Sequence, residues 1–351
     1  MKAKSILVML SATIVWFTLS ACQLGVNDAN QDPNQQSITI FSERHYDTDR
    51  VLYDLFEAET GIQVNLVRDG ADPLLSRLEN EGEDTIADVL LVADAGSLER
   101  AKNRDLLLSI ESPFLNEHVP ENYRDIDGYW YGVSARARVL VYHPERVDVN
   151  ALSTYEALIE PAWEGRVVTR SSTNIYNQSL MASFIEVMGD QGARDFASGL
   201  VANFAKSPSG NDRAQALSVL SGEADVAIMN TYYIGVMLNS GDATQIEAAA
   251  SLKLFFPNQG TTGTHVNASA AGVVKHSSNP ELATQFIEFL LSETAQRHFT
   301  TNNFEYPVNP NVEWDSLLLS WGTFVPQDIN LAVLGENNNR AKEIMDQVGW
   351  R

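Results

Sequence analysis

From Ser37 onward the chain alternates between short apolar segments and amphipathic segments, and this alternation limits the folds it can adopt. The apolar runs SITIF (37–41), IQVNLV (62–67) and DVLLV (88–92) predict buried strands. Between the first two lies DTDRVLYDLFEAETG, whose apolar residues share one helical face and whose Gly61 suits a helix end. Uninterrupted apolar strands that alternate with helices predict an α/β fold with a parallel sheet covered by helices on both faces.

The same alternation continues to the end of the chain. Further strands are predicted at 137–142, 165–170, 225–229, 252–256 and 270–275. Helices are predicted at 73–81, at 95–104, from the end of the 165–170 strand to about 188, after the 225–229 strand, at 280–291 and near the C-terminus. So many βα units in about 315 residues indicate two lobes instead of one sheet.

The chain is expected to cross between these lobes more than once, because no Pro-rich or low-complexity linker separates them. We place one lobe at 37–135 with 262–309, and the other at 136–261 with 310–351. Two α/β lobes joined by a hinge, with a ligand cleft between them, are a common architecture for proteins that capture a ligand.

The charge of the chain excludes some classes of partner. Lys+Arg number 24 and Asp+Glu 46, which gives a formal net charge of -22. Such a surface repels the phosphates of nucleic acids and anionic lipid headgroups, so no nucleic-acid partner is expected, whereas a bound cation remains compatible. Hydrophobic residues make up 44% of the chain, enough for a full core.

The N-terminal segment has the pattern of a targeting signal. Lys2 and Lys4 precede a short apolar stretch that ends in Leu19-Ser20-Ala21-Cys22. This ending looks like the lipobox of bacterial lipoproteins, which implies cleavage after residue 21 and acylation of Cys22, the only cysteine of the chain. Residues 22–36 then form an Asn/Gln-rich tether. We expect an extracytoplasmic protein anchored to a membrane through lipid; the alternative is a plain secretory signal with an unrelated cysteine.

Standard catalytic signatures are missing from the sequence. It contains no GxxxxGK[ST], GxGxxG, GxSxG or HExxH motif, and it has no paired carboxylates suited to acid–base work. One cysteine also excludes an intramolecular disulfide, a thiolate zinc site and an iron–sulfur cluster in a monomer. The sequence therefore predicts a binding protein instead of an enzyme, and a monomer is the simplest reading for a hinge-closing receptor.

Tyrosines follow three of the predicted strands, each at the point where the chain turns into a helix. His45-Tyr46 follows the strand at 37–41, Tyr176 the strand at 165–170, and Tyr232-Tyr233 the strand at 225–229. Ligands collect at the carboxyl ends of parallel strands. With 11 Tyr in the chain, about 0.3 tandem Tyr pairs are expected by chance, so the pair alone means little. The recurrence at three equivalent positions points to a site.

Four phenols and one imidazole suit a hard, highly charged cation. Ionising one ordinary tyrosine at pH 7 costs about 4 kcal/mol, so only a strongly polarising ion offsets the ionisation of several, which favours Fe(III) over Mg(II) or Ca(II). Four phenolates on Fe(III) leave a net charge of -1, which one arginine would neutralise. Arg136 and Arg138 point to the same face of a predicted strand, and an ordinary surface position is the alternative for each.

These motifs resemble the ferric-iron-binding proteins of bacterial ATP-binding-cassette importers, of the FutA/IdiA type. The matching stretches include SERHYDTD, ADVLLVADAG, RARVLVY, RSSTNIYNQSL, NTYYIG and NNFEYPV, and they span nearly the whole chain beyond the tether. The resemblance implies a two-lobed periplasmic-binding-protein fold. It also implies an iron ligand set, which maps here to His45, Tyr46, Tyr176, Tyr232 and Tyr233.

The resemblance further places Arg136 near the iron, and it implies an ABC permease as the partner that receives the cargo. Ser42-Glu43 departs from the serine-rich version common in that group, beside the ligands. Three alternatives stay open: Fe(II) held by the same residues with neutral phenols, a different ligand such as another metal, an oxyanion or a polyamine, and an extracytoplasmic hydrolase.

Overall fold

The computed structural model describes residues 35–44 and 46–351. The predicted signal peptide at 1–21, Cys22, most of the tether and His45 lie outside the described residues. Within the described part the strands are β1 (Ser37–Ser42), β2 (Gln63–Arg68), β3 (Val89–Val92), β4 (Leu107–Leu108), β5 (Tyr131–Tyr142), β6 (Val167–Val168), β7 (Val226–Asn230), β8 (Lys253–Phe255), β9 (Val266–Val274) and β10 (Tyr306–Pro307).

The described helices surround these strands. The α-helices are α1 (Asp49–Thr60), α2 (Ala71–Glu81), α3 (Ala95–Asn103), α4 (Pro113–His118), α5 (Ile175–Ala202), α6 (Asp212–Leu220), α7 (Tyr232–Leu238), α8 (Ala243–Ser251), α9 (Pro280–Leu290), α10 (Glu293–His298), α11 (Ser316–Ser320), α12 (Val333–Glu336) and α13 (Asn338–Val348). The short helices are η1 (Gly82–Asp84), η2 (Glu121–Tyr123), η3 (Val149–Ala151), η4 (Glu156–Ile159), η5 (Pro161–Trp163) and η6 (Phe299–Asn303).

The sheet is mixed, not purely parallel as the apolar runs predicted. Its central order is β2-β1-β3-β9-β5-β7-β6. β1 pairs in parallel with β2 and β3, and β6 with β7, whereas β9 and β5 pair with each other and with the strands beside them in antiparallel fashion. The prediction of a parallel sheet is therefore wrong at the centre of the molecule, since a fully buried strand is equally apolar in either direction.

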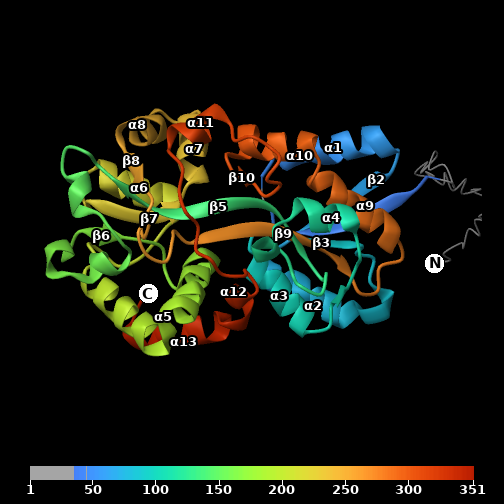
Figure 1. The fold of residues 1–351 in the computed structure, drawn as a ribbon, viewed down its shortest axis with the longest axis horizontal. Coiled ribbons are helices and arrows are strands. Elements are labelled where there is room, and N and C mark those ends of the chain that lie inside the picture. Colours follow the sequence, from blue (N-terminus) through green and yellow to red (C-terminus); the bar gives the residue numbers. More distant parts are fainter. Residues whose placement is uncertain (1–34, 45) are drawn as a thin grey trace, which may run out of the picture. The chain divides into compact units, whose positions relative to one another are not determined.

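The strands β5 and β9 connect two groups of strands (Figure 1). The first half of β5 pairs with β9 from Tyr131 to Ala137, and its second half pairs with β7 from Arg138 to Tyr142. One strand thus belongs to both groups, which is why the strands form a single hydrogen-bonded network. Every residue of β5 is buried.

Both faces of the sheet are covered by helices, as predicted. Along β5, Val139 and Val141 belong to one apolar cluster and Leu140 to the other, because alternate side chains of a strand point to opposite faces. Helices α1, α7, α8 and α9 supply the first cluster, and α2, α3, α5 and α13 the second. Figure 1 shows most of the two sets of helices on opposite sides of β5 and β9.

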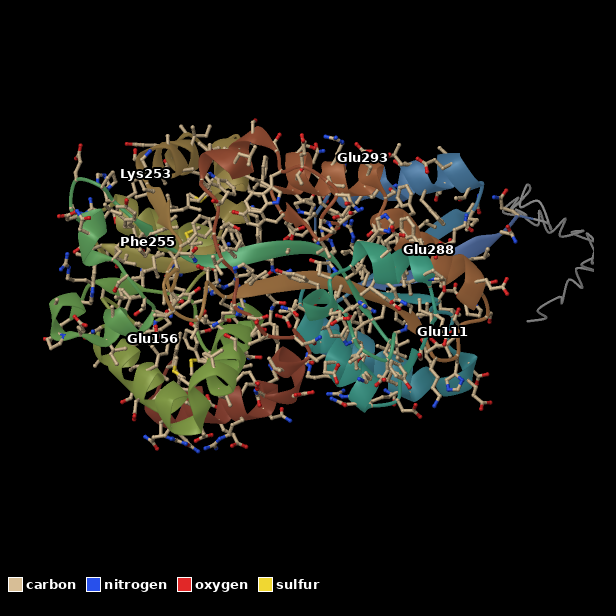
Figure 2. The ribbon with its side chains drawn as sticks, in the orientation of Figure 1. Glu111, Glu156, Lys253, Phe255, Glu288 and Glu293 are labelled. Carbon is tan, nitrogen blue, oxygen red and sulfur yellow. The ribbon has the colours of Figure 1, made fainter. Side chains whose placement is uncertain are left out.

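Helix α5 is broken at Gly189, where the backbone has φ 75° and ψ 170°. A left-handed φ of this kind favours glycine, which explains why the predicted helix ends near 188 before a second helical segment begins. None of the helices that the structure describes is long and apolar enough to span a membrane. Acidic side chains such as Glu111 and Glu293 are exposed (Figure 2), in keeping with the negative net charge.

Candidate metal centre

The four predicted tyrosines come together in the structure. Tyr46 lies between β1 and α1, Tyr176 is the second residue of α5, and Tyr232 and Tyr233 open α7. The ring of Tyr232 is stacked on that of Tyr233, with centroids 4.3 Å apart, and meets the ring of Tyr46 edge-on at 5.8 Å. The hydroxyls of Tyr176 and Tyr232 are 3.4 Å apart. Residues more than 180 positions apart thus form one cluster of phenols.

The turns that lead into α5 and α7 carry polar residues at the N-cap positions. Asn174 and Thr231 occupy the N-cap positions of the two helices, but neither side chain caps its helix with a hydrogen bond. The Oδ1 atom of Asn174 and the Oγ1 atom of Thr231 are buried without a hydrogen-bond partner. The first turns therefore present tyrosines without the side-chain caps that such sequences usually supply.

Burial raises the pKa of every tyrosine in the cluster. The pKa of Tyr176 rises to about 12, and those of Tyr46 and Tyr232 rise well above the usual value of 10. The pKa of Tyr233 is also raised, by burial first and by the charge of Asp212 second. The phenols also oppose one another's ionisation, because charge on Tyr176 raises the pKa of both Tyr46 and Tyr232.

All four phenols are therefore neutral at pH 7 in the metal-free protein. A pKa near 12 means that ionising Tyr176 alone at pH 7 costs about 7 kcal/mol, more than the roughly 4 kcal/mol for an ordinary tyrosine. The fold thus makes phenolates harder to form than the sequence indicates. A cation that binds them must supply a correspondingly larger electrostatic stabilisation.

Arg136 lies beside the tyrosine cluster. It is 2% exposed, and its guanidinium carbon is 5.3 Å from the centroid of the Tyr176 ring. Its Nη1 donates to the Ser269 hydroxyl at 3.2 Å, and its Nη2 donates to the Ala93 carbonyl. The Nε atom is buried without a partner. The surface alternative for Arg136 is wrong, since its charge is fixed at the tyrosines.

Arg138 is buried as well but has a different environment. Its guanidinium forms an ion pair with Asp212 at 3.2 Å and donates to the side chains of Asn177 and Asn230. The surface alternative is therefore wrong for this residue too. The two arginines are two positions apart on β5, yet Arg136 faces a tyrosine ring while Arg138 is neutralised by a carboxylate.

A third buried arginine escaped the sequence analysis. Arg44 is 1% exposed, and its guanidinium carbon lies 4.6 Å from the Tyr46 ring centroid. It donates to Asp49 at 2.7 and 3.0 Å and to Glu305 at 3.1 Å, while its Nη1 also reaches the Ser269 hydroxyl at 2.5 Å. Glu305 raises the pKa of Tyr46 and Arg44 lowers it. Arg44 and Glu305 are 261 positions apart, and no sequence pattern connects them.

Two further arginines lie over the tyrosine rings. The guanidinium carbon of Arg170 is 5.6 Å from the Tyr176 ring centroid, and that of Arg213 is 5.7 Å from the Tyr233 ring centroid. A pocket of about 480 Å³ adjoins the cluster, and Tyr46 and Arg213 are among its lining residues. Arginines therefore border the cluster on several sides, although Glu305 and Asp212 lie close enough to raise the pKa values of Tyr46 and Tyr233.

Conventional metal ligands do not gather elsewhere in the part of the chain that the structure describes. Within residues 35–44 and 46–351, no three His, Cys, Asp or Glu side chains lie close enough together to hold a metal ion. Phenol oxygens are hard donors once ionised, and such donors suit hard cations. The tyrosine cluster is thus the candidate metal centre, and His45 lies outside the described residues.

Comparison with known proteins identifies the class of protein. The family model described as "Bacterial extracellular solute-binding protein" matches residues 84–326. The chain belongs to this family. This membership confirms the prediction of an extracytoplasmic binding protein instead of an enzyme.

Several relatives are iron-uptake or ferric-binding proteins by name, and others, at 26% and 28% identity, are thiamine-binding periplasmic proteins. Iron uptake protein A1 of Synechocystis sp. is 46% identical over 323 residues, which are 92% of this chain and 90% of that protein. The structure of Trichodesmium IdiA (FutA) in complex with iron and citrate ligands is 44% identical, with a TM-score of 0.86 over 90% of this chain and 100% of that chain. The ferric binding protein from Campylobacter jejuni is 38% identical, also with a TM-score of 0.86, and the same shares are covered. These likenesses confirm the predicted fold class and the predicted FutA/IdiA group.

Proposed function

We propose that this chain captures Fe(III) for import, with the imidazole of His45 and the phenolates of Tyr46, Tyr176, Tyr232 and Tyr233 as its ligands. The observation that carries the proposal is the convergence of four tyrosines from three distant segments into one cluster, in which Tyr232 is buried and the other three are half-buried. Two similar proteins, iron uptake protein A1 of Synechocystis sp. and the ferric binding protein from Campylobacter jejuni, are named for the same cargo.

The electrostatics of the cluster favour a trivalent ion. Buried neutral phenols bind a weakly polarising cation poorly, because each must lose a proton against a raised pKa. Fe(III) with four phenolates has a net charge of -1, and the buried guanidinium of Arg136 offsets that charge. Fe(II) held by the same residues, with the phenols neutral, is the second candidate.

Capture and release follow from where the ligands lie. In our proposal the lobe of 37–135 with 262–309 supplies His45 and Tyr46, and the lobe of 136–261 with 310–351 supplies the other three tyrosines. The ion bonds to all of them only when the lobes are closed, so binding stabilises the closed state. Docking on an ABC permease would favour opening, which separates the ligands and frees the ion.

Iron titrations of the wild type and two variants test this function. We expect the wild type to bind one Fe(III) tightly under air and to bind Fe(II) far more weakly without oxygen, because only Fe(III) offsets the phenol ionisation. Tyr176→Phe and Tyr233→Phe should each weaken Fe(III) binding by more than 100-fold, since even partners of metal ligands change affinity by about 10–100-fold.

Tyr129→Phe serves as the matched control, because Tyr129 lies over Lys102 and is not part of the cluster. If Tyr176→Phe and Tyr233→Phe both bind Fe(III) like the parent, the ligand set is wrong. Metal analysis of protein purified without added metal separates iron from the other metals, and an anionic or cationic organic ligand in its place would contradict the cargo.

We also propose that Cys22 carries a lipid that anchors the protein to a membrane. The Leu19-Ser20-Ala21-Cys22 sequence and the polar segment after it support this proposal. Cys22→Ser should move the protein from the membrane fraction to the soluble extracytoplasmic fraction, since a lost acyl chain removes about 0.8 kcal/mol per buried methylene group. Fractionation with an Asn34→Gln control, outside the Leu19–Cys22 motif, checks this; an unchanged membrane fraction in Cys22→Ser would contradict lipid anchoring.

A further inference from the structure

Arg138 is the centre of a buried network beneath two tyrosine-bearing helices. It lies opposite Asn230 in the pairing of β5 with β7, and it is 1% exposed. Its Nη1 donates to Asn230 Oδ1 at 3.0 Å and to Asp212 Oδ2 at 3.2 Å. Its Nη2 donates to Asn177 Oδ1 at 2.6 Å and to the Ile228 carbonyl at 3.3 Å. One guanidinium therefore connects three elements: α5, α6 and β7.

The partners of Arg138 are neighbours of the tyrosines in the chain. Asn177 directly follows Tyr176 in the first turn of α5, and its Nδ2 donates to the carbonyl of Arg170 at 2.6 Å. On the other side, Asn230 ends β7 two residues before Tyr232, and its backbone N–H donates to Asp212 at 2.8 Å. Arg138 thus holds the start of α5 and the start of α7 at a set separation.

The tyrosine hydroxyls lie where this connection has its effect. The Tyr176 and Tyr232 hydroxyls are 3.4 Å apart, although the two residues are 56 positions apart and belong to different helices. Ligands must lie within about 0.5 Å of their productive positions for tight metal binding. A small shift of one helix start against the other would therefore weaken the site without exposing it to solvent.

The charge of Arg138 does not explain its presence at this position. Asp212 accepts from Arg138 at 3.2 Å in the buried interior, whereas Arg170 lies further from the same carboxylate, at 3.8 Å, so the charge of Arg138 is paired. Arg136 differs in this respect, because it donates to the Ser269 hydroxyl and the Ala93 carbonyl instead of a carboxylate, and its guanidinium faces the Tyr176 ring. What Arg138 supplies is a planar fork that serves four acceptors at once, which a lysine ammonium does not reproduce.

We infer that Arg138 is a positioning residue for iron binding: through Asn177 and Asn230 it fixes Tyr176 relative to Tyr232 and Tyr233. This inference rests on the proposed metal site. It goes beyond that site, because it assigns the geometry of three ligands to one side chain that touches none of them. It also separates the role of Arg138 from the charge compensation that we assign to Arg136.

Arg138→Lys and Asn177→Ala test the inference together. The first keeps the charge and removes the fork. The second keeps the Arg138–Asp212 pair and removes the connection to α5, together with the bond from Asn177 to the Arg170 carbonyl. We expect Fe(III) affinity, measured by competition with a chelator, to fall by about 10–100-fold in each variant. We also expect the visible phenolate-to-Fe(III) absorption band to shift in each, because the Tyr176 oxygen no longer approaches the ion as it does in the parent.

Arg166→Lys is the matched control. Arg166 makes an ion pair with Asp225 at 2.6 Å in the same half of the sheet, at a partly exposed position away from the tyrosines. It should keep the parental affinity and band. Unfolding midpoints of the metal-free proteins show whether Arg138→Lys folds. If it does not fold, the iron affinity and absorption band of Asn177→Ala test the inference alone.

Parental affinity and an unshifted band in folded Asn177→Ala would overturn the inference. So would a loss of affinity that comes with an unshifted band and a matching loss of metal-free stability, since that result indicates a purely structural role. Failure of the wild type to bind Fe(III) or to show the band would instead contradict the proposed function itself.

Discussion

Tyr232→Phe should weaken Fe(III) binding by more than 100-fold while leaving the stability of the metal-free protein almost unchanged. Tyr232 is 3% exposed and is the one tyrosine that contacts the other three, so its oxygen lies at the centre of the proposed ligand set. Phenylalanine keeps both ring contacts and removes only that oxygen. The hydroxyl's distance of 3.4 Å to Tyr176 is long for an O–H···O hydrogen bond, so its loss costs little in the metal-free state.

Thermal unfolding with and without Fe(III) measures both effects in one experiment. Bound iron stabilises the wild type by mass action, by about 4 kcal/mol when the free ion is at 1,000 times the dissociation constant. Tyr232→Phe should lose most of this stabilisation and keep the metal-free midpoint, whereas Tyr129→Phe should keep both. If the iron-dependent rise of Tyr232→Phe equals that of the parent, Tyr232 is not a ligand.

Acid should weaken iron binding steeply, by up to 10,000-fold between pH 7 and pH 6. Burial raises the pKa of all four tyrosines, so each is protonated in the metal-free protein and each releases one proton when it ligates Fe(III). Below their pKa values, each such proton lowers the logarithm of the binding constant by about one for every unit that pH falls. For four phenolates, the logarithm of the Fe(III) binding constant therefore changes with pH with a slope of about four.

The pH dependence of iron affinity differs from the pH dependence of folding stability. A raised pKa in the folded state affects stability only as pH rises through the unfolded tyrosine pKa near 10, so these groups leave metal-free stability unchanged between pH 6 and 8. Chelator competition across that range, corrected for the chelator's own protonation, measures the slope for iron alone. A slope of one or less would mean that the phenols stay neutral in the complex.

The sequence was sufficient to predict the parts of the site that depend on local pattern. Tyr176 and Tyr232-Tyr233 stand between an apolar run and a helix, so the place of each at a strand end follows from periodicity alone. Gly61 and the end of the helix before Gly189 were predictable for the same local reason, since glycine accepts a positive φ.

What escaped prediction depends on contacts between distant residues. The ion pairs of Arg44 with Glu305 and of Arg138 with Asp212 join segments 261 and 74 positions apart, and no periodicity selects the partners. The direction of β5 and β9 also escaped, because a strand buried on both faces has the same composition whichever way it runs. The start of β5 at Tyr131 was missed since Gly132 and Ser134 interrupt the apolar pattern.

The visible absorption spectrum of the iron-loaded wild type tests the central claim most directly. If ionised tyrosines hold Fe(III), one equivalent of Fe(III) under air should produce a phenolate charge-transfer band, and a reductant with a Fe(II) chelator should abolish it. A protein that binds one equivalent of iron and stays colourless in air would contradict phenolate ligation of Fe(III).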